Sequence, residues 1–190
     1  MNKKMELKYR LLDHPFYKSW SDGAVTTEQL AKYGASYSDF IKKIPDFWKK
    51  IITDFSRFSI EGMTIINEEK SHIAMWNRWL TQLEPAENYP KMDVTITQFE
   101  LMNTSELLGA LHAFEIQQPE VAFTKKQGLM KFYGFKEKDL VYFDEHMAED
   151  DHINFGKMLA DKYADAKDFK NGFEKGSELI YKSLDLFVEC

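Results

Sequence analysis

Residues 62–83 read GMTIINEEKSHIAMWNRWLTQL, a run without proline in which apolar side chains recur every three or four positions. This spacing matches the turn of an α-helix, about 3.6 residues long, so the apolar side chains gather along one face. The stripe consists of Ile65, Ile66, His72, Met75, Trp76, Trp79 and Leu83. Because its large aromatic members need a surface to pack against, the segment predicts a long helix inside a bundle.

The same helical spacing covers most of the remaining chain. Five prolines and nine glycines in 190 residues leave long uninterrupted stretches, which favours helices. Further helices are predicted over 27–41, 47–55, 105–133, 138–163 and 169–187, with a kink at Pro119 and a helix end at Gly134. Only Met92–Thr97 (MDVTIT) alternates like a strand, and a single strand cannot form a sheet. We therefore predict an all-α, single-domain bundle of about seven helices over residues 1–190.

Composition limits the classes of partner. Hydrophobic residues make up 44% and aromatic residues 15% of the chain, which is enough for a packed core. No run approaches the roughly 20 apolar residues of a membrane span, and the lysine-rich opening lacks the hydrophobic region of a signal peptide. The 25 Lys and Arg residues against 31 Asp and Glu residues give a net charge of −6, without a basic block. Neither nucleic acid nor an anionic membrane is therefore expected as the main partner.

The chain contains one cysteine, Cys190, at its last position. An internal disulfide cannot form, which is typical of a reducing compartment, so we expect a cytoplasmic protein. Neither a thiolate zinc site nor a cysteine nucleophile in the core is expected for the same reason. Chemistry then has to come from the five histidines, the carboxylates, and the tyrosine and lysine side chains.

Two Glu-x-x-His pairs, Glu69–His72 and Glu149–His152, are the strongest chemical signal. Residues three apart on a helix lie only about 60° apart around its axis, so a carboxylate and an imidazole can reach one metal ion. One such pair is common by chance in an acidic helical protein, where it usually marks a solvated face. Two pairs on different helices, with a lone glutamate from a third, are typical of a carboxylate-bridged di-iron or di-manganese site. Glu115 is the candidate for that glutamate, because its apolar neighbours turn the carboxylate inward, where it needs a cation.

His146 precedes the second pair and leaves the choice of ligand open there. His146 and Asp150 lie about 40° apart on an ideal helix, whereas His146, Glu149 and His152 span an arc of about 120°. The spacing alone does not decide between Glu149 and Asp150, and a local change of helix winding would alter the answer. Both residues are retained as candidate ligands.

Several runs of residues resemble one known family, in order over most of positions 10–160. They are HPFYKSWSDG (14–23), LAKY (30–33), NEE (67–69), HIAMW (72–76), FEIQQP (114–119), GLMKFYG (128–134) and YFDEH (142–146). The chain resembles the haem-oxygenase-like helical bundle, which includes thiaminase-type and pyrroloquinoline-quinone-synthase-type proteins. Within that fold it is most similar to the CADD-like 4-aminobenzoate synthases, which belong with the haem-oxygenase-like dimetal oxidases.

The resemblance implies an oxygen-dependent enzyme with two metal ions, Fe/Fe or Fe/Mn, and O2 as co-substrate. The implied ligands are Glu68 or Glu69, His72, Glu115, His146, Glu149 or Asp150, and His152. Carboxylate and imidazole donors suit iron and manganese better than an ion that prefers thiolates. We also expect an external reductant, and homodimers are common for the fold that the chain resembles.

In that subfamily the enzyme is also its own substrate. A tyrosine side chain is oxidatively cut from the backbone to supply the ring of 4-aminobenzoate, a folate precursor, and a lysine supplies the amino group. The matching positions are Tyr17 for the ring and Lys125 for the nitrogen, and Tyr142 of the YFDEH run is counted with the catalytic residues. The reaction would consume the protein, so each chain would turn over once.

Two departures from the family pattern keep alternatives open. The first Glu-to-His interval is shorter than usual, and the last motif, usually His-x3-Asp-x2-His, has His152 one residue early. Each lost residue rotates the later side chains by about 100° on an ideal helix, so either the winding changes or one metal site is incomplete. One alternative is a dimetal oxidase acting on an external small molecule by desaturation, C–C cleavage or N-oxygenation. The other is a metal-free helical protein that binds a partner protein.

Overall fold

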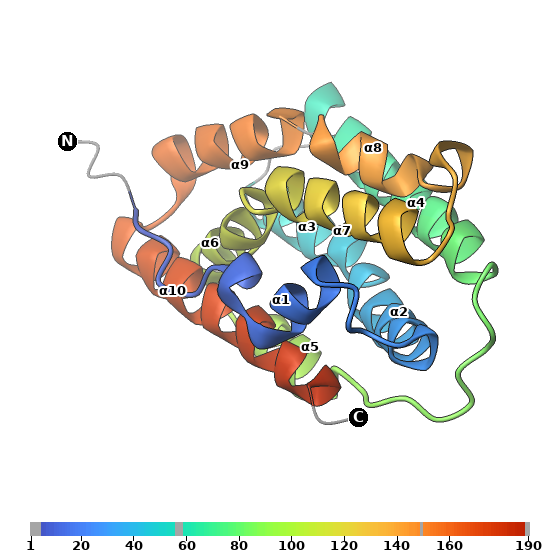
Figure 1. Ribbon diagram of the computed structural model, residues 1–190. Coiled ribbons are helices and arrows are strands. Elements are labelled where there is room, and N and C mark those ends of the chain that lie inside the picture. Colours follow the sequence, from blue (N-terminus) through green and yellow to red (C-terminus); the bar gives the residue numbers. More distant parts are fainter. Residues whose placement is uncertain (1–4, 56–58, 149, 189–190) are drawn as a thin grey trace.

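The computed structural model describes residues 5–55, 59–148 and 150–188, and these ranges form helices and connecting loops with no strand (Figure 1). The α-helices are α1 (Pro15–Ser21), α2 (Thr27–Ile41), α3 (Ile44–Asp54), α4 (Ile60–Leu80), α5 (Asp93–Glu100), α6 (Thr104–Glu115), α7 (Gln118–Phe132), α8 (Val141–Met147), α9 (Asp150–Tyr163) and α10 (Ala166–Ser183). Short 3₁₀ helices cover Leu11–Asp13, Glu137–Asp139 and Leu184–Phe187. The predicted all-α bundle is confirmed, and none of the helices in the described ranges has the length and apolar character needed to cross a membrane.

Helix α4 is the long amphipathic helix predicted from residues 62–83. It begins after Ser59, whose hydroxyl accepts a hydrogen bond from the backbone N–H of Gly62. Ile65, Ile66, Trp76 and Trp79 of the predicted stripe are buried, whereas Met75 is partly buried and Leu83 lies beyond the end of the helix. Two ionisable side chains, Glu69 and His72, are buried on the same face. A buried carboxylate and a buried imidazole need polar partners, and these come from α6, α8 and α9.

Helix α6 is buried along most of its length and packs closely against α10 (Figure 1). Glycines permit this approach, because a Cβ atom at Gly172 would lie 1.8 Å from the carbonyl oxygen of Glu106. A Cβ atom at Gly109 would likewise lie 2.0 Å from the carbonyl oxygen of Phe169. Only residues without a side chain let the two backbones come so near. This packing holds α6 in place, and with it Glu115 at the last position of the helix.

Aromatic rings fill the centre of the bundle between α2, α4 and α6. The ring centre of Tyr37 on α2 lies 4.8 Å from that of Trp76 on α4. Phe40 on α2 lies 5.5 Å from Phe114 on α6, measured in the same way. The rings exclude water from this region, so an ionisable side chain inside it is shifted toward its neutral form.

The strand-like alternation predicted for Met92–Thr97 is wrong, because the segment forms most of α5. Val94 is 74% exposed, whereas Thr95, Ile96 and Phe99 are buried. The buried positions follow the helical steps of three and four, and not the steps of two that a half-buried strand requires. An alternation over six residues is too short to distinguish a strand from one face of a helix.

Two stretches predicted as long helices are interrupted in the structure. The 105–133 stretch divides into α6 and α7 just before Pro119, which occupies the first turn of α7. The 138–163 stretch divides into α8 and α9 at Ala148, whose carbonyl accepts a hydrogen bond from the N–H of Asp150. Each break turns the chain directly after a candidate ligand, Glu115 in the first case and His146 in the second.

Candidate active site

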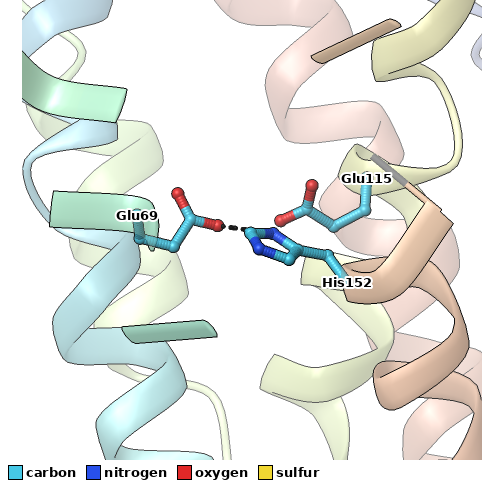
Figure 2. Close-up of side chains that lie close together, drawn as sticks. All are labelled: Glu69, Glu115 and His152. Atoms are coloured by element: carbon cyan, nitrogen blue, oxygen red, sulfur yellow. Dashed lines mark ion pairs between the residues drawn. The ribbon is translucent and has the colours of Figure 1, made fainter. Parts of the chain in front are cut away.

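Three helices bring two carboxylates and an imidazole together. Glu69 of α4, Glu115 of α6 and His152 in the first turn of α9 each offer a donor atom, and these atoms lie within 4.8 Å of one another. Figure 2 shows Glu69 and His152 pointing toward each other from opposite helices, with Glu115 beside the His152 ring. All three side chains are buried. The structure therefore assembles one member of each Glu-x-x-His pair with the lone glutamate.

Two further histidines extend this group. The Nδ1 atom of His72 is 3.5 Å from a carboxylate oxygen of Glu69, one turn earlier on α4. The ring centre of His72 lies 4.5 Å from that of His146 and 5.8 Å from that of His152. The Nδ1 atom of His146 is 2.7 Å from the carbonyl oxygen of Tyr142, so Nδ1–H donates there and Nε2 becomes the acceptor. Below, the carboxylate–histidine cluster means Glu69, His72, Glu115, His146 and His152.

Burial and mutual contact shift the protonation of this cluster. Burial alone would raise the pKa of Glu69, but hydrogen bonds and charge interactions with His152 and His72 lower it to about 2. Burial and the nearby Glu69 raise the pKa of Glu115 to about 8. Burial and the neighbouring His72 lower the pKa of His146 to about 3, which keeps this imidazole neutral near pH 7. A neutral imidazole is the form that binds a metal ion.

The donor atoms of the cluster fit divalent cations. One carboxylate oxygen of Glu115 is buried without a hydrogen-bond partner in the described part of the chain, which costs free energy unless a cation supplies the missing interaction. A cation would also remove the repulsion between Glu69 and Glu115 that favours the protonated acid. Carboxylate oxygens and imidazole nitrogens, without a thiolate, are ligands that iron and manganese use.

The residues of the shortened last motif fall on two helices, α8 and α9, which are separated by a break. His146 lies near the end of α8 and His152 near the start of α9. The rotation of about 100° per residue in a single helix therefore does not fix the angle between the two imidazoles. Both are buried, and both face His72 from their separate helices. Asp150, the first residue of α9, is exposed, and Glu149 lies outside the described residues. The structure thus brings His146 and His152 into the cluster and leaves Asp150 at the surface.

Glu68 approaches the cluster from the solvent side. Its side chain is 45% exposed, and its Oε2 atom lies 3.1 Å from Nε2 of His152. The Nδ1 atom of the same ring lies 3.1 Å from Oε1 of Glu69. His152 is therefore held between two consecutive glutamates of α4. Sequence reasoning missed this arrangement, because it depends on how α9 packs against α4.

A second buried group surrounds Lys125 of α7. The Lys125 amine nitrogen lies 5.5 Å from the centre of the Tyr17 ring. It lies 4.7 to 5.7 Å from the ring centres of Tyr33, Tyr37 and Trp76, none of which the sequence singles out for this role. Lys125 and Tyr17 are each 2% exposed and line a narrow cavity of about 10 Å³, which is room for one water molecule. We refer to this space as the lysine cavity.

The ionisable side chains of the lysine cavity favour their neutral forms. Burial lowers the pKa of Lys125 to about 7, so a large share of the side chain is neutral amine near pH 7. Burial also raises the pKa of Tyr17, although a hydrogen bond of 3.0 Å to the Tyr33 hydroxyl acts in the opposite direction. Near pH 7 the cavity therefore holds a lysine that is partly neutral amine, beside a protonated phenol.

Trp20 and Gly128 hold α1 against α7 next to this cavity. The indole N–H of Trp20, one turn after Tyr17, donates to the backbone carbonyl of Lys125 at 3.2 Å. The Trp20 ring packs on Gly128, where an added Cβ atom would come within 2.6 Å of it. These two contacts set the position of Tyr17 along α7, and so relative to Lys125.

Aromatic side chains connect the lysine cavity with the carboxylate–histidine cluster. Trp76 lies beside Lys125, and its ring centre is 4.8 Å from that of Tyr142. Tyr142, predicted to be catalytic, packs 4.0 Å from His146 between ring centres. The two buried groups are therefore separated by no more than two aromatic side chains.

The sequence of the chain is similar to that of characterised enzymes. The profile of a family described as iron-containing redox enzymes matches residues 32–179, which include the whole carboxylate–histidine cluster and Lys125. A 4-aminobenzoate synthase of Nitrosomonas europaea is 30% identical over 183 residues, covering 82% of this chain and 74% of that protein. A 4-aminobenzoate synthase of Chlamydia muridarum is 28% identical over 200 residues, covering 94% of this chain and 85% of that protein.

A similar fold occurs in a solved structure. The crystal structure of a TenA homolog from Pseudomonas syringae pv. tomato matches with a TM-score of 0.68, over 96% of this chain and 86% of that chain. The two sequences are 15% identical, so the likeness concerns the fold alone. Because the match extends over nearly the whole chain, the arrangement of helices as a whole is a known architecture.

Proposed function

The chain belongs to the family of iron-containing redox enzymes and is an oxidoreductase, and on this basis we propose that it makes 4-aminobenzoate from its own Tyr17 side chain and the Lys125 amine. The names of the relatives that it resembles support this product. The observation that carries the proposal is the lysine cavity, which Tyr17 and Lys125 line together and which no more than two aromatic side chains separate from a cluster suited to metal ions.

The carboxylate–histidine cluster would hold two metal ions, Fe/Fe or Fe/Mn. When bound, such a pair would supply the activation of O2 for the oxidation of an aromatic side chain, with electrons from an external reductant. The chain prepares the ligands for this role. His146 donates its Nδ1–H to the Tyr142 carbonyl, which aims Nε2 into the cluster. Glu69 is ionised, and Glu115 has a buried oxygen that a cation would satisfy.

Lys125 would supply the nitrogen. An ammonium ion has no lone pair to donate, and burial lowers the pKa of Lys125 to about 7, so neutral amine is present near neutral pH. The amine lies 5.5 Å from the centre of the Tyr17 ring, whereas reacting atoms need to approach to about 3–3.5 Å. The amine and the ring therefore have to move closer together before a bond forms.

Tyr17 would supply the ring and the carboxyl carbon. Conversion to 4-aminobenzoate requires the ring to exchange its hydroxyl, which leaves as water, for the amino group. The Cε–Nζ bond of Lys125 has to break at the same time, with O2 as the oxidant and Cε left as an aldehyde. The conversion also requires the Cα–Cβ bond of Tyr17 to break, with Cβ becoming the carboxyl carbon. The hydrogen bond between the Tyr17 and Tyr33 hydroxyls holds the end of the ring where the nitrogen enters. Because the side chain is lost, each chain would turn over once.

The size of the lysine cavity favours the chain's own tyrosine over an external substrate. A space of about 10 Å³ accepts one water molecule but no aromatic ring or acyl chain unless core side chains move. A residue already in the cavity needs neither a binding site nor an entry path. Only O2 and reducing equivalents have to arrive from outside.

Anaerobic reconstitution provides the test. Protein loaded with Fe(II), alone or with Mn(II), is exposed to O2 and a reductant, and 4-aminobenzoate is measured together with intact protein mass. We expect at most one product molecule per chain and loss of the side chain at position 17 in peptide maps. The Tyr17→Phe variant should make no product while binding metal normally, and Tyr9→Phe, outside the cavity, serves as the control. Product from Tyr17→Phe, or product without a change of protein mass, would contradict the proposal.

A further inference from the structure

We propose that Glu68 is a positioning residue for the metal centre, which accepts a hydrogen bond from Nε2–H of His152 and thereby directs Nδ1 of that ring toward the metal. This inference rests on the proposed function. It adds a residue that acts through a ligand, and it assigns the metal-binding nitrogen of His152.

The two nitrogens of His152 face different environments. Nδ1 is 3.1 Å from Oε1 of Glu69, which belongs with Glu115 to the buried group of donor atoms. Nε2 is 3.1 Å from Oε2 of Glu68. A neutral imidazole carries one N–H and one lone pair, so one nitrogen can donate while the other binds a cation. The side that faces Glu69 and Glu115 is the side on which a cation has further ligands.

The two neighbouring glutamates of α4 differ in how far their side chains are exposed to solvent. The Glu69 side chain is 6% exposed and the Glu68 side chain 45% exposed. Glu68 also lines a surface groove together with Glu61 and Asp151. Its carboxylate therefore lies between solvent and the outer edge of the His152 ring. Glu68 reaches the far nitrogen of the ring, whereas Glu69 reaches the nitrogen inside the cluster.

The position of His152 in α9 explains why it needs this support. The helix begins at Asp150, only two residues earlier, so His152 lies in its first turn. A carboxylate that accepts from the outer N–H fixes the ring orientation and the tautomer, and it makes the other nitrogen a stronger donor. Loss of such a partner typically costs about 10- to 100-fold in metal affinity.

The test compares Glu68→Ala and Glu68→Gln with Glu61→Ala, a matched control on the same helix and the same groove. Mn(II) and Co(II) affinities are measured with the metal-free protein, and the Co(II) absorption spectrum reports the ligands. We expect Glu68→Ala to weaken binding about 10- to 100-fold. Glu68→Gln should stay within a few-fold of the wild type, because its amide oxygen still accepts the hydrogen bond, and its Co(II) spectrum should be unchanged. Glu61→Ala should behave as the wild type, and thermal unfolding of each metal-free variant checks that it is folded.

Each contrary outcome has a distinct meaning. Wild-type affinity in a folded Glu68→Ala variant would overturn the role of Glu68 and leave the metal centre standing. Loss of a metal equivalent and an altered spectrum in Glu68→Gln, as expected for Glu69→Gln, would make Glu68 a ligand and overturn the inference. Absence of metal binding by the wild type would overturn the inference together with the proposed function.

Discussion

The amine nitrogen of Lys125 lies 5.5 Å from the centre of the Tyr17 ring, in a cavity whose walls are largely aromatic and apolar. Aromatic faces attract an ammonium ion, but they do not replace the hydration that it loses on burial. Burial therefore lowers the pKa of Lys125 to about 7. A lysine kept in this environment costs stability, and this is expected where function needs a reactive amine.

The first prediction concerns the stability of Lys125→Met. The pKa of Lys125 is about 7 in the folded chain and 10.5 when the side chain is exposed to water, as it is in the unfolded chain. Between about pH 7 and pH 10.5 the unfolded chain therefore binds one more proton than the folded chain. Stability of the wild type therefore rises with pH from about 7 to about 10.5, and the methionine variant lacks this rise. At pH 7 and below we expect Lys125→Met to be more stable, by a difference on the order of 4 kcal/mol. Denaturant unfolding from pH 6 to 10 measures the free energy of unfolding of both proteins. A difference between them that does not decrease as pH rises would contradict the prediction.

The second prediction concerns the pH dependence of product formation. In the proposed reaction the neutral amine is the reactive form of Lys125, and its fraction increases as pH rises through its pKa of about 7. The single-turnover rate should therefore increase from pH 6 to pH 8 and then level off, at constant metal content. Quenched samples analysed for 4-aminobenzoate give this rate. A rate that falls over the same interval would argue against Lys125 as the nitrogen donor.

The third prediction concerns the hydroxyl of Tyr33, which is 3.0 Å from the hydroxyl of Tyr17. Tyr33→Phe removes this hydrogen bond and keeps the ring, so the cost in stability should be about 1 kcal/mol. The Tyr17 ring loses the contact at the end that would react in the proposed function, and the single-turnover rate should fall about tenfold or more. Metal affinity should not change, because Tyr33 is not in the carboxylate–histidine cluster. An unchanged rate would show that the hydrogen bond does not orient the ring.

Helical periodicity predicts the part of the site that lies on α4 and α6. Glu69 and His72 share the buried face of Trp76, because residues three and four apart occupy one side of a helix. Glu115 follows from its apolar surroundings, since a carboxylate among core residues needs a partner. The spacing of residues along the sequence is sufficient to predict these positions because α4 and α6 are regular helices.

The remaining parts of the site depend on contacts between distant segments. Periodicity does not pair Tyr17 with Lys125, and only the family resemblance indicates it before the packing of α1 on α7 is known. The choice between Glu149 and Asp150 assumed one continuous helix, and the break at Ala148 removes that assumption. The contact of Glu68 with His152 depends on the same break, because it determines where the first turn of α9 lies.

The fourth prediction concerns Gly128, on which the Trp20 ring packs. A Cβ atom at this position would come within 2.6 Å of the ring, so Gly128→Ala has to displace Trp20 and with it α1. Overpacking of this kind costs about 1–3 kcal/mol. Because Tyr17 lies on α1, the single-turnover yield should fall about 10- to 100-fold while metal affinity stays the same. Gln127→Ala, at an exposed neighbouring position, is the matched control, and a Gly128→Ala variant with full yield would contradict this role of the contact.

The last prediction concerns Glu115→Gln and separates stability from metal binding. The pKa of Glu115 is raised from 4.5 to about 8 by burial and by Glu69, so the carboxyl destabilises the metal-free fold increasingly from pH 4.5 up to about 8. An amide of the same size has no such proton to bind, so metal-free Glu115→Gln should be more stable at pH 7, by a difference on the order of 3 kcal/mol. It should also bind metal more weakly, because the buried anionic ligand is lost. Metal ions should therefore raise the melting temperature of the wild type more than that of the variant. Thermal unfolding with and without Mn(II) tests both parts, with the exposed Glu120→Gln as control. A metal-free variant less stable than the wild type, or one with the same metal-induced shift, would contradict the assignment of Glu115 as a buried ligand.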